Sequence, residues 1–266
     1  MTDSLVKKLA EFVLESRKIV VLTGAGISTE SGISDYRSKG GLWDRFQPVT
    51  IQEFIASEER RKEYWQQKME LYESLKSAKP NLGHRAIAEM ETIGKLRGLI
   101  TQNIDGLHQM AGTNPEKIAE LHGTNRETIC LSCGVLESWE EVYERLKAAD
   151  VSPLCESCGG LLKPNTISFG QALNPDLLQR AVEWSRDCDF FLAVGSTLIV
   201  EPAASLPRLA KRGGAKLAIV TLSETPLDDA ADIKINSSIG STLHAAMELV
   251  KRRLQNNDDE KTSYKS

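Results

Sequence analysis

Short apolar runs that alternate with helical patterns constrain the fold of this chain most strongly. Runs such as "KIVVLT" at 18–23 and "DFFLAVG" at 189–195 have the length and residue types of buried strands. The expected strands cover residues 18–23, 96–101, 116–122, 165–169, 189–195, 215–222 and 231–236. The expected helices cover residues 3–16, 83–94, 175–186, 203–212 and 240–254. This alternation predicts an α/β fold with a parallel, doubly wound sheet of the Rossmann type.

Polar or glycine-rich turns follow four of the expected strands. Because the carboxyl ends of parallel strands meet at one edge of a sheet, ligands bind there. The turns are Gly24-Ala25-Gly26, Gln102-Asn103-Ile104-Asp105, His122 and Gly195-Ser196-Thr197. The sequence therefore predicts that these four turns form one binding site.

The Gly24-Ala25-Gly26 turn is typical of loops that bring backbone N–H groups to a pyrophosphate, although a tight strand–helix turn has the same glycines. A dehydrogenase would continue into a helix and a second strand. This chain continues instead with the glycine-rich segment from Ser31 to Trp43, which predicts a mobile loop that folds over a ligand. Within it, Asp35 and Arg37 could contact phosphate or ribose, or Arg37 is a solvated surface charge.

Two C-x-x-C pairs, Cys130/Cys133 and Cys155/Cys158, have the spacing of zinc knuckles. Four cysteine ligands leave no coordination position open for water, so the expected zinc is structural, with one ion per chain. Disulfides or a redox pair are the alternatives. Cys188 is expected to be a small core residue.

One of the four histidines, His122, is a candidate general base. It ends an expected strand at the ligand edge of the sheet, although a buried structural histidine is an equal alternative at this stage. We expect His84 to be structural, and His108 and His244 to serve packing or the surface.

Charge and hydropathy limit the function classes. The 266 residues carry a net charge of −4, which does not suggest a nucleic-acid partner. No apolar run is long enough to cross a bilayer, and the first residues lack the unbroken apolar core of a signal peptide. We therefore expect a cytoplasmic protein without a membrane partner, with a disordered polar tail over residues 255–266.

Together these motifs resemble the sirtuin family of NAD-dependent protein lysine deacylases. The matching stretches are "GAGISTESGISDYR", "TQNIDGLH", "ELHGT", the paired C-x-x-C motifs, "FGQ" and "GSTLIVEPAASLP", in the family's order. The resemblance implies one catalytic domain over residues 1–254, with a smaller inserted part made of a zinc ribbon and a helical module. The large NAD-binding part would cover about 1–37, 84–124 and 165–254, the helical module 38–83 and the zinc ribbon 125–164.

The resemblance also implies roles for individual residues. His122 matches the catalytic histidine, with Asn103 and Asp105 around the nicotinamide and its ribose. The NAD site would comprise Gly24, Ala25, Gly26, Ser28, Asp35, Tyr36, Arg37, Gln102, Asn103, Ile104, Asp105, Gly195, Ser196, Thr197, Thr221, Ser223 and Ile239. The substrate peptide would add as a strand between "ISFGQ" and "STLIVEP", with the acyl-lysine in an apolar tunnel near Phe169, Gly170 and Val200.

The implied reaction transfers the acyl group of a protein lysine, with acetyl favoured, to ADP-ribose. The acyl oxygen would attack C1′ of the nicotinamide ribose, nicotinamide would leave, and His122 would act as the base on a ribose hydroxyl. ADP-ribosyl transfer and NAD hydrolysis are alternatives at the same site. A non-enzymatic ADP-ribose sensor or zinc-stabilised scaffold is a third. The oligomeric state is not predicted.

Some positions depart from the usual family pattern, namely Ser34, Tyr36, Gln171 and Thr221. Succinyl-selective members carry a Tyr-x-x-Arg pair in the acyl pocket, and the corresponding "RRKEYWQQKMELYES" has none. Lys68 is the only cation between Glu63 and Leu71, and we expect it to be solvated. The sequence thus predicts an apolar acyl pocket and a higher kcat/KM for acetyl-lysine than for succinyl-lysine, because burying an unpaired carboxylate is costly.

Overall fold

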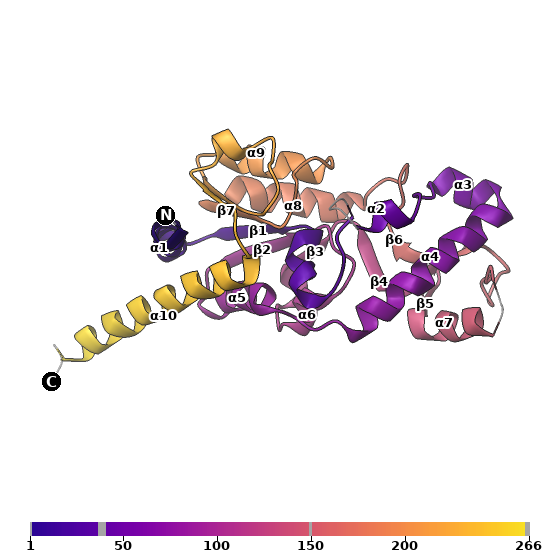
Figure 1. Ribbon diagram of the computed structural model, residues 1–266, viewed down its shortest axis with the longest axis horizontal. Coiled ribbons are helices and arrows are strands. Elements are labelled where there is room, and N and C mark those ends of the chain that lie inside the picture. The colour runs from indigo at the N-terminus through magenta and orange to yellow at the C-terminus, as the bar shows by residue number, and fades with distance from the viewer. Residues whose placement is uncertain (1, 37–40, 149–150, 264–266) are drawn as a thin grey trace.

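The computed structural model describes residues 2–36, 41–148 and 151–263. It has two lobes, each built around its own sheet (Figure 1). The larger lobe holds six strands in the order β3-β2-β1-β7-β8-β9, and all neighbouring pairs are parallel. The strands are β1 Ile19–Thr23, β2 Leu96–Thr101, β3 Ile118–Glu120, β7 Phe190–Val194, β8 Lys216–Val220 and β9 Ile233–Ile235. The doubly wound order confirms the predicted fold class.

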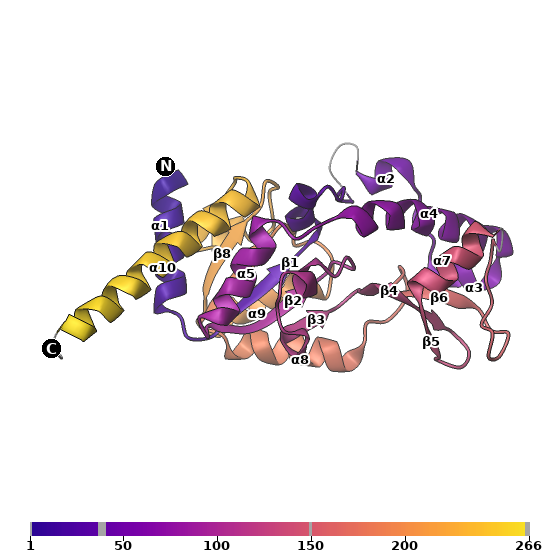
Figure 2. The same ribbon diagram turned by 90° about the horizontal axis from the view of Figure 1, so that it is seen from below.

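Helices cover both faces of this sheet, and successive strand residues feed the two cores alternately. Val21 and Leu192 pack against α1, α5 and α10, whereas Val20 and Phe191 pack against α8 and α9. The helices are α1 Thr2–Glu15, α5 Leu82–Thr92, α8 Pro175–Asp187, α9 Leu206–Arg212 and α10 Ile239–Ser263. Figure 2 shows α1, α5 and α10 together on one side of the sheet.

The smaller lobe combines a three-stranded antiparallel sheet, ordered β5-β4-β6, with several helices. Its elements are α2 Leu42–Arg45, α3 Ile51–Ala56, α4 Glu58–Ser77, β4 Gly123–Cys130, β5 Leu136–Ser138, α7 Trp139–Lys147 and β6 Leu162–Thr166. Aromatic side chains hold α4 to α7, the helix that follows β5. Trp65 of α4 stacks on Trp139 at 5.6 Å between ring centroids, and Tyr72 lies 5.3 Å from the same ring.

The remaining helical turns are short and lie near the ligand edge of the large sheet or on its connections. They are η1 Ala25–Ser31, α6 Leu107–Met110, η2 Pro115–Lys117, η3 Ala203–Ser205 and η4 Asp228–Ala230. The expected helix over 203–212 therefore begins as the 3₁₀ turn η3 and continues as α9.

Two expected strands differ from the structure. The strand predicted over 165–169 lies at 162–166 and belongs to the antiparallel sheet, where Lys163 pairs with Ile129. The strand includes Pro164, which is tolerated because β6 lies at the edge of its sheet. β3 is shorter than the predicted 116–122, because Pro115 starts the 3₁₀ turn η2 and residues 121–122 form a turn.

The prediction of a disordered tail from residue 255 was wrong for its first nine residues. Helix α10 continues to Ser263. Its first turns are fixed by packing of Leu243 and Met247, and propagating an existing helix costs little with residues such as Gln, Glu and Lys. Figure 1 shows the last turns of α10 extending beyond the body of the larger lobe. Among the described helices, none has the length and apolar character needed to cross a membrane.

Candidate active site

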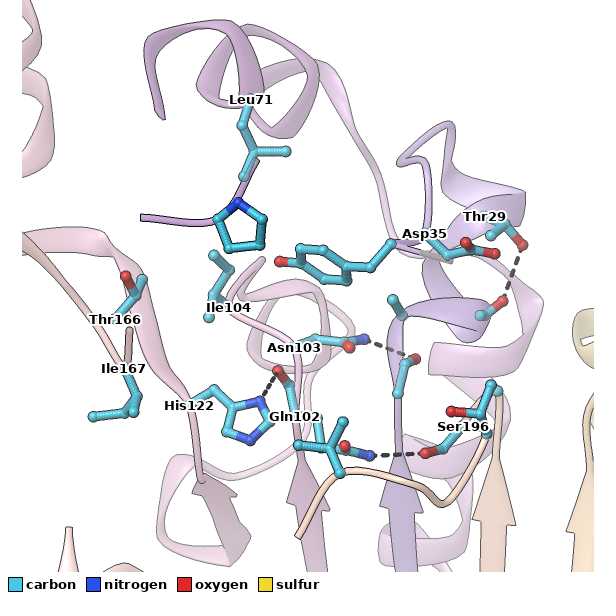
Figure 3. Close-up of a pocket in the computed structure, with 18 of the residues that line it drawn as sticks. Thr29, Asp35, Leu71, Gln102, Asn103, Ile104, His122, Thr166, Ile167 and Ser196 are labelled. Carbon is cyan, nitrogen blue, oxygen red and sulfur yellow. Dashed lines mark hydrogen bonds between the residues drawn. The ribbon is translucent and has the colours of Figure 1, made fainter. Parts of the chain in front are cut away.

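A cavity of about 1010 Å³ lies where the two lobes meet, and the carboxyl ends of the parallel strands form one wall of it. All four predicted turns contribute to that wall. The lining residues from them are Gly24, Ala25, Gly26, Gln102, Asn103, Ile104, His122, Gly195, Ser196 and Thr197. Figure 3 shows Gln102, Asn103, His122 and Ser196 pointing into one space above the strand ends. The cavity is large enough for a ligand of dinucleotide size.

The glycines of the first turn allow two strand ends to approach closely. A Cβ on Gly24 or Gly26 would lie 2.7 or 2.8 Å from the carbonyl oxygen of Gly195. Gly195 itself has φ +61°, which favours glycine. The Gly26 N–H donates to the Gly195 carbonyl at 2.9 Å. The glycine motif therefore joins β1 to β7 and places the start of η1 at the cavity.

Asn103 is held by a buried hydrogen-bond network. Its Nδ2 donates to the Gly24 carbonyl at 3.1 Å and to Ser28 Oγ at 3.3 Å. Ser28 Oγ in turn donates to Asp105 Oδ2 at 2.7 Å, and the Leu107 N–H donates to Oδ1 at 3.0 Å. Burial raises the pKa of Asp105, while the hydrogen bonds from Leu107 and Ser28 act in the opposite direction. Asn103 reaches the cavity, whereas Ser28 and Asp105 lie behind its wall.

His122 lines the cavity and is fixed through one ring nitrogen. Its Nδ1 lies 3.0 Å from the Gln102 carbonyl, so Nδ1 carries the proton and Nε2 keeps its lone pair. Burial lowers the pKa of His122, and the bond to Gln102 offsets this in part. The side chain of Gln102 is held by donating to Ser196 Oγ at 2.9 Å. His122 is therefore a neutral, oriented imidazole, as a general base requires.

Two further histidines lie behind this wall, in agreement with the structural and packing roles expected for His84 and His108. Their ring centroids are 4.8 Å apart, and both side chains are buried. His108 Nε2 lies 3.0 Å from Thr23 Oγ1, which donates to Thr101 Oγ1, and Thr101 Oγ1 accepts from the Asn103 N–H. The pair thus supports the backbone from which Asn103 projects.

The opposite end of the cavity is rich in hydroxyl groups. Thr221, Ser223 and Ile239 line it, as predicted, but so do three residues that the sequence did not indicate, namely Glu30, Ser237 and Ser238. Glu30 Oε1 accepts from the Gly240 N–H at 2.9 Å and from Ser238 Oγ at 3.1 Å, which ties η1 to the start of α10. These contacts join η1 near the start of the chain to α10 near its end, so no local sequence signal could have revealed them.

The loop after η1 is described only in part. Asp35 and Tyr36 line the cavity. Arg37 lies outside the described residues. Ser34 is exposed and does not line the cavity.

The smaller lobe closes the cavity with α4 and the segment after β6. Phe169, Gly170 and Val200, which we expect on the substrate side, line the cavity. From α4, Tyr64, Gln67, Lys68 and Leu71 line it as well. Lys68, which we expected to be solvated, is half-buried and lines the cavity, because tertiary packing of α4 turns the face with Tyr64, Lys68 and Leu71 toward it.

The four paired cysteines converge in the smaller lobe, and their sulfur atoms all lie within 4.8 Å of one another. The Sγ–Sγ distances are 3.5 Å for Cys130–Cys158 and 3.8 Å for Cys133–Cys155. A tetrahedral zinc with Zn–S bonds of about 2.3 Å separates its sulfur ligands by about 3.8 Å, so the site fits this ion. Cys130 Sγ also accepts from the backbone N–H groups of Ser132 and Cys133, as thiolates in zinc knuckles do. Cys188 is buried away from this group, at the end of α8, as expected for a small core residue.

Comparison with known proteins gives consistent matches. Residues 24–202 match the model of the Sir2 family. An NAD-dependent protein deacetylase of Thermodesulfovibrio yellowstonii is 44% identical over 246 residues, which cover 92% of this chain and 95% of that protein. An NAD-dependent protein deacylase of Archaeoglobus fulgidus is 40% identical over 93% of this chain and 96% of its own length. A solved Sir2 structure with a deacetylated p53 peptide and 3′-O-acetyl-ADP-ribose is 38% identical, with a TM-score of 0.86, and covers 91% of this chain and 97% of that one.

Proposed function

The chain belongs to the Sir2 family, and from this membership and the geometry of the cavity we propose that it is an NAD-dependent protein lysine deacylase that acts chiefly on acetyl-lysine. The overall reaction converts acyl-lysine, NAD and water into lysine, nicotinamide and O-acyl-ADP-ribose. The relatives are named for deacetylation and deacylation, and one neighbour holds the deacetylated peptide together with acetyl-ADP-ribose.

The observation that carries the proposal is the state of His122. Its Nδ1–H is bound to the Gln102 carbonyl, and its Nε2 faces a cavity large enough for a dinucleotide and a lysine side chain. Bound NAD would supply the ADP-ribose group that accepts the acyl group as nicotinamide leaves. His122 Nε2 would take the proton from a ribose hydroxyl as that hydroxyl attacks the acyl carbon.

Asn103 is proposed to orient either the nicotinamide ribose or the water that the reaction consumes. Because its Nδ2 is committed to Gly24 and Ser28, its Oδ1 remains to accept from a hydroxyl or a water in the cavity. Asp105 binds Ser28 and the Leu107 N–H from behind the wall, so we assign it the positioning of Ser28 and Asn103. Its expected contact with the carboxamide of nicotinamide stays a prediction.

NAD is proposed to lie along the strand ends, from the glycine turn to the hydroxyl-rich end. Backbone N–H groups near η1 and the turn after β7 would bind the phosphates, and Gln102 and Ile104 would contact the nicotinamide half. The proposed NAD residues that line the cavity are Gly24, Ala25, Gly26, Asp35, Tyr36, Gln102, Asn103, Ile104, Gly195, Ser196, Thr197, Thr221, Ser223 and Ile239. A role for Arg37 also stays a prediction.

The peptide is proposed to pair with the backbone segments 167–171 and 196–202, which carry Phe169 and Val200. Phe169 and Ile199 are exposed at 49% and 59%, a large exposure for apolar side chains. The partners are thus acyl-lysine proteins, and the proposal places the reaction in the cytoplasm. We further propose that residues 1–254 form one catalytic domain. Its NAD-binding part comprises about 1–37, 84–124 and 165–254, and its smaller part is the helical module 38–83 with the zinc ribbon 125–164.

One assay tests the proposal. The purified protein, NAD and an acetyl-lysine peptide are incubated, and every product is identified by mass spectrometry. We expect equal amounts of deacetylated peptide, nicotinamide and O-acetyl-ADP-ribose. An ADP-ribosylated protein, or ADP-ribose released without loss of the acetyl group, would instead identify a transferase or an NAD hydrolase. Absence of any nicotinamide would refute an enzymatic role.

A further inference from the structure

Helix α4 brings one ammonium group to the cavity wall. Lys68 lines the cavity and is half-buried, and its Nζ lies 5.2 Å from the centroid of the Tyr64 ring. Tyr64 and Lys68 are four residues apart, so they share one face of α4. Lys68 makes no hydrogen bond or ion pair with any residue that the structure describes. Its charge is therefore available to a ligand in the cavity.

A second ammonium group reinforces the positive potential at this wall. Lys163 of β6 is fully buried, and its Nζ lies 5.7 Å from the same Tyr64 ring. Two of its three protons are donated to backbone carbonyls, at 3.0 Å to that of Pro164 and by a second bond to that of Thr166. Burial alone would raise the pKa of Tyr64, but the charges of Lys68 and Lys163, together with hydrogen bonds to Ser168 and Thr166, outweigh it and lower the pKa to about 7. This corner thus favours negative charge, and of the two lysines only Lys68 lines the cavity, where a ligand can reach it.

Short contacts connect this corner to the proposed catalytic base. The Tyr64 hydroxyl lies 3.2 Å from Thr166 Oγ1, and the N–H of the next residue, Ile167, donates to the His122 carbonyl at 2.9 Å. Thr166, Ile167 and His122 line the same side of the cavity (Figure 3). An acyl group whose carbonyl lies near His122 can therefore extend toward Tyr64 and Lys68.

The carboxylates of the cavity belong to other elements. Among the described lining residues they are Glu30, Asp35 and Glu201, from η1, the loop after it and the turn after β7. Glu30 is bound to the start of α10, and Glu201 accepts from Ser205 Oγ at 2.7 Å. In Figure 3, Asp35 and Thr166 lie on opposite sides of the view. Neither α4 nor β6 contributes a carboxylate to the cavity, so none of its own carboxylates neutralises Lys68.

We propose that Lys68, supported by the Tyr64 hydroxyl, binds the terminal carboxylate of an acidic acyl group on the substrate lysine, so that the enzyme removes succinyl as well as acetyl groups. This inference rests on the proposed deacylase function and extends its substrate class. The bond changes are those of the deacylation itself: the amide C–N bond breaks, the acyl group joins a ribose hydroxyl, and the terminal carboxylate is carried over unchanged. The apolar acyl pocket expected from the absence of a Tyr-x-x-Arg pair is thereby replaced by a pocket with a cationic end.

A matched pair of acyl groups tests the inference. Succinyl and butyryl have the same four-carbon length and differ in the terminal carboxylate, so the ratio of their kcat/KM values on one peptide isolates the charge. We expect the wild-type ratio to exceed one. In Lys68→Met we expect it to fall roughly tenfold or more, the worth of a hydrogen bond to a charged group. Lys68→Arg, which keeps the charge, should retain most of the preference. Lys62→Met is the control, because Lys62 pairs with Glu58 on the same helix and does not line the cavity.

The outcomes separate this inference from the function on which it rests. If acetyl and butyryl peptides are deacylated while the succinyl peptide is a worse substrate than butyryl, the deacylase function stands and the role of Lys68 is refuted. A succinyl preference that Lys68→Met leaves unchanged also refutes that role. If none of the three peptides yields nicotinamide or loses its acyl group, the proposed function itself fails.

Discussion

The buried pair of His84 and His108 makes the stability of this protein sensitive to mild acid. Both side chains are buried, and neither His84 Nε2 nor His108 Nδ1 has a hydrogen-bond partner among the described residues. Burial lowers the pKa of His84 to about 4, and burial followed by the charge of His84 lowers that of His108 well below its usual value. In the folded protein, both rings therefore stay neutral at pH 5.

The sign of the effect follows from proton uptake. An unfolded chain binds a proton at each histidine below a pH of about 6.5, whereas the folded protein does not, so stability is present above that pH and is lost as the pH falls toward 4. For a folded pKa of about 4, acidification from pH 7 to pH 5 removes about 2 kcal/mol of the free energy of unfolding. Because His108 also stays neutral in the folded protein, its protonation in the unfolded chain lowers the free energy of unfolding further.

The assay is urea unfolding followed by circular dichroism at pH 7 and pH 5, for the wild type and His84→Gln. Other groups also titrate in this range, so the quantity of interest is the difference between the two proteins in their loss of unfolding free energy. We expect the variant to lose about 2 kcal/mol less than the wild type, even if it is less stable at both pH values. His244→Gln, which leaves the buried pair intact, is the control. An equal acid dependence of wild type and His84→Gln would refute the reasoning.

Four further predictions concern the base, the metal and the core. His122→Ala should still bind NAD in a titration but deacylate at least ~100-fold more slowly, and near-normal turnover would exclude His122 as the base. Because burial lowers the pKa of His122, the acid limb of kcat/KM in the wild type should lie below pH 6.5, and a limb above that value would contradict this. Cys130→Ser or Cys155→Ser should lose the single zinc, measured by elemental analysis, and lower the Tm, whereas metal-free protein of unchanged stability would argue against structural zinc. Gly98→Ala should cost about 1–3 kcal/mol in urea unfolding, because its Cβ would lie 2.3 Å from the Trp184 ring, and an unchanged midpoint would show that the ring can move.

The larger lobe could be predicted from the sequence because its strands are apolar on both faces and its ligand turns follow strand ends. Gln102, Asn103 and His122 converge for this reason alone, since parallel strands share one carboxyl edge. The smaller sheet was harder to predict. β6 contains Lys163 and Pro164, and the buried lysine is accepted only because carbonyls of its own segment bind the ammonium group.

The position of Lys68 could not be predicted because α4 carries two similar faces. Trp65, Met69 and Tyr72 follow the same spacing as Tyr64, Lys68 and Leu71, shifted by one residue. Packing on Trp139 of α7 selects the first face for the core, and the second is left to the cavity. That choice depends on an element more than sixty residues away in the chain, and the sequence of α4 alone does not contain it.

The strand β4 has a consequence for how this protein can evolve. It begins directly after His122 and ends at Cys130, so the first metal ligand lies eight positions after the proposed base, about 26 Å along an extended strand. Removing or adding one residue would turn the following side chains to the other face of the sheet and point Cys130 away from its three partners. Residues within β4 can therefore be exchanged during evolution, but a change in the length of β4 would prevent His122 and Cys130 from both reaching their sites.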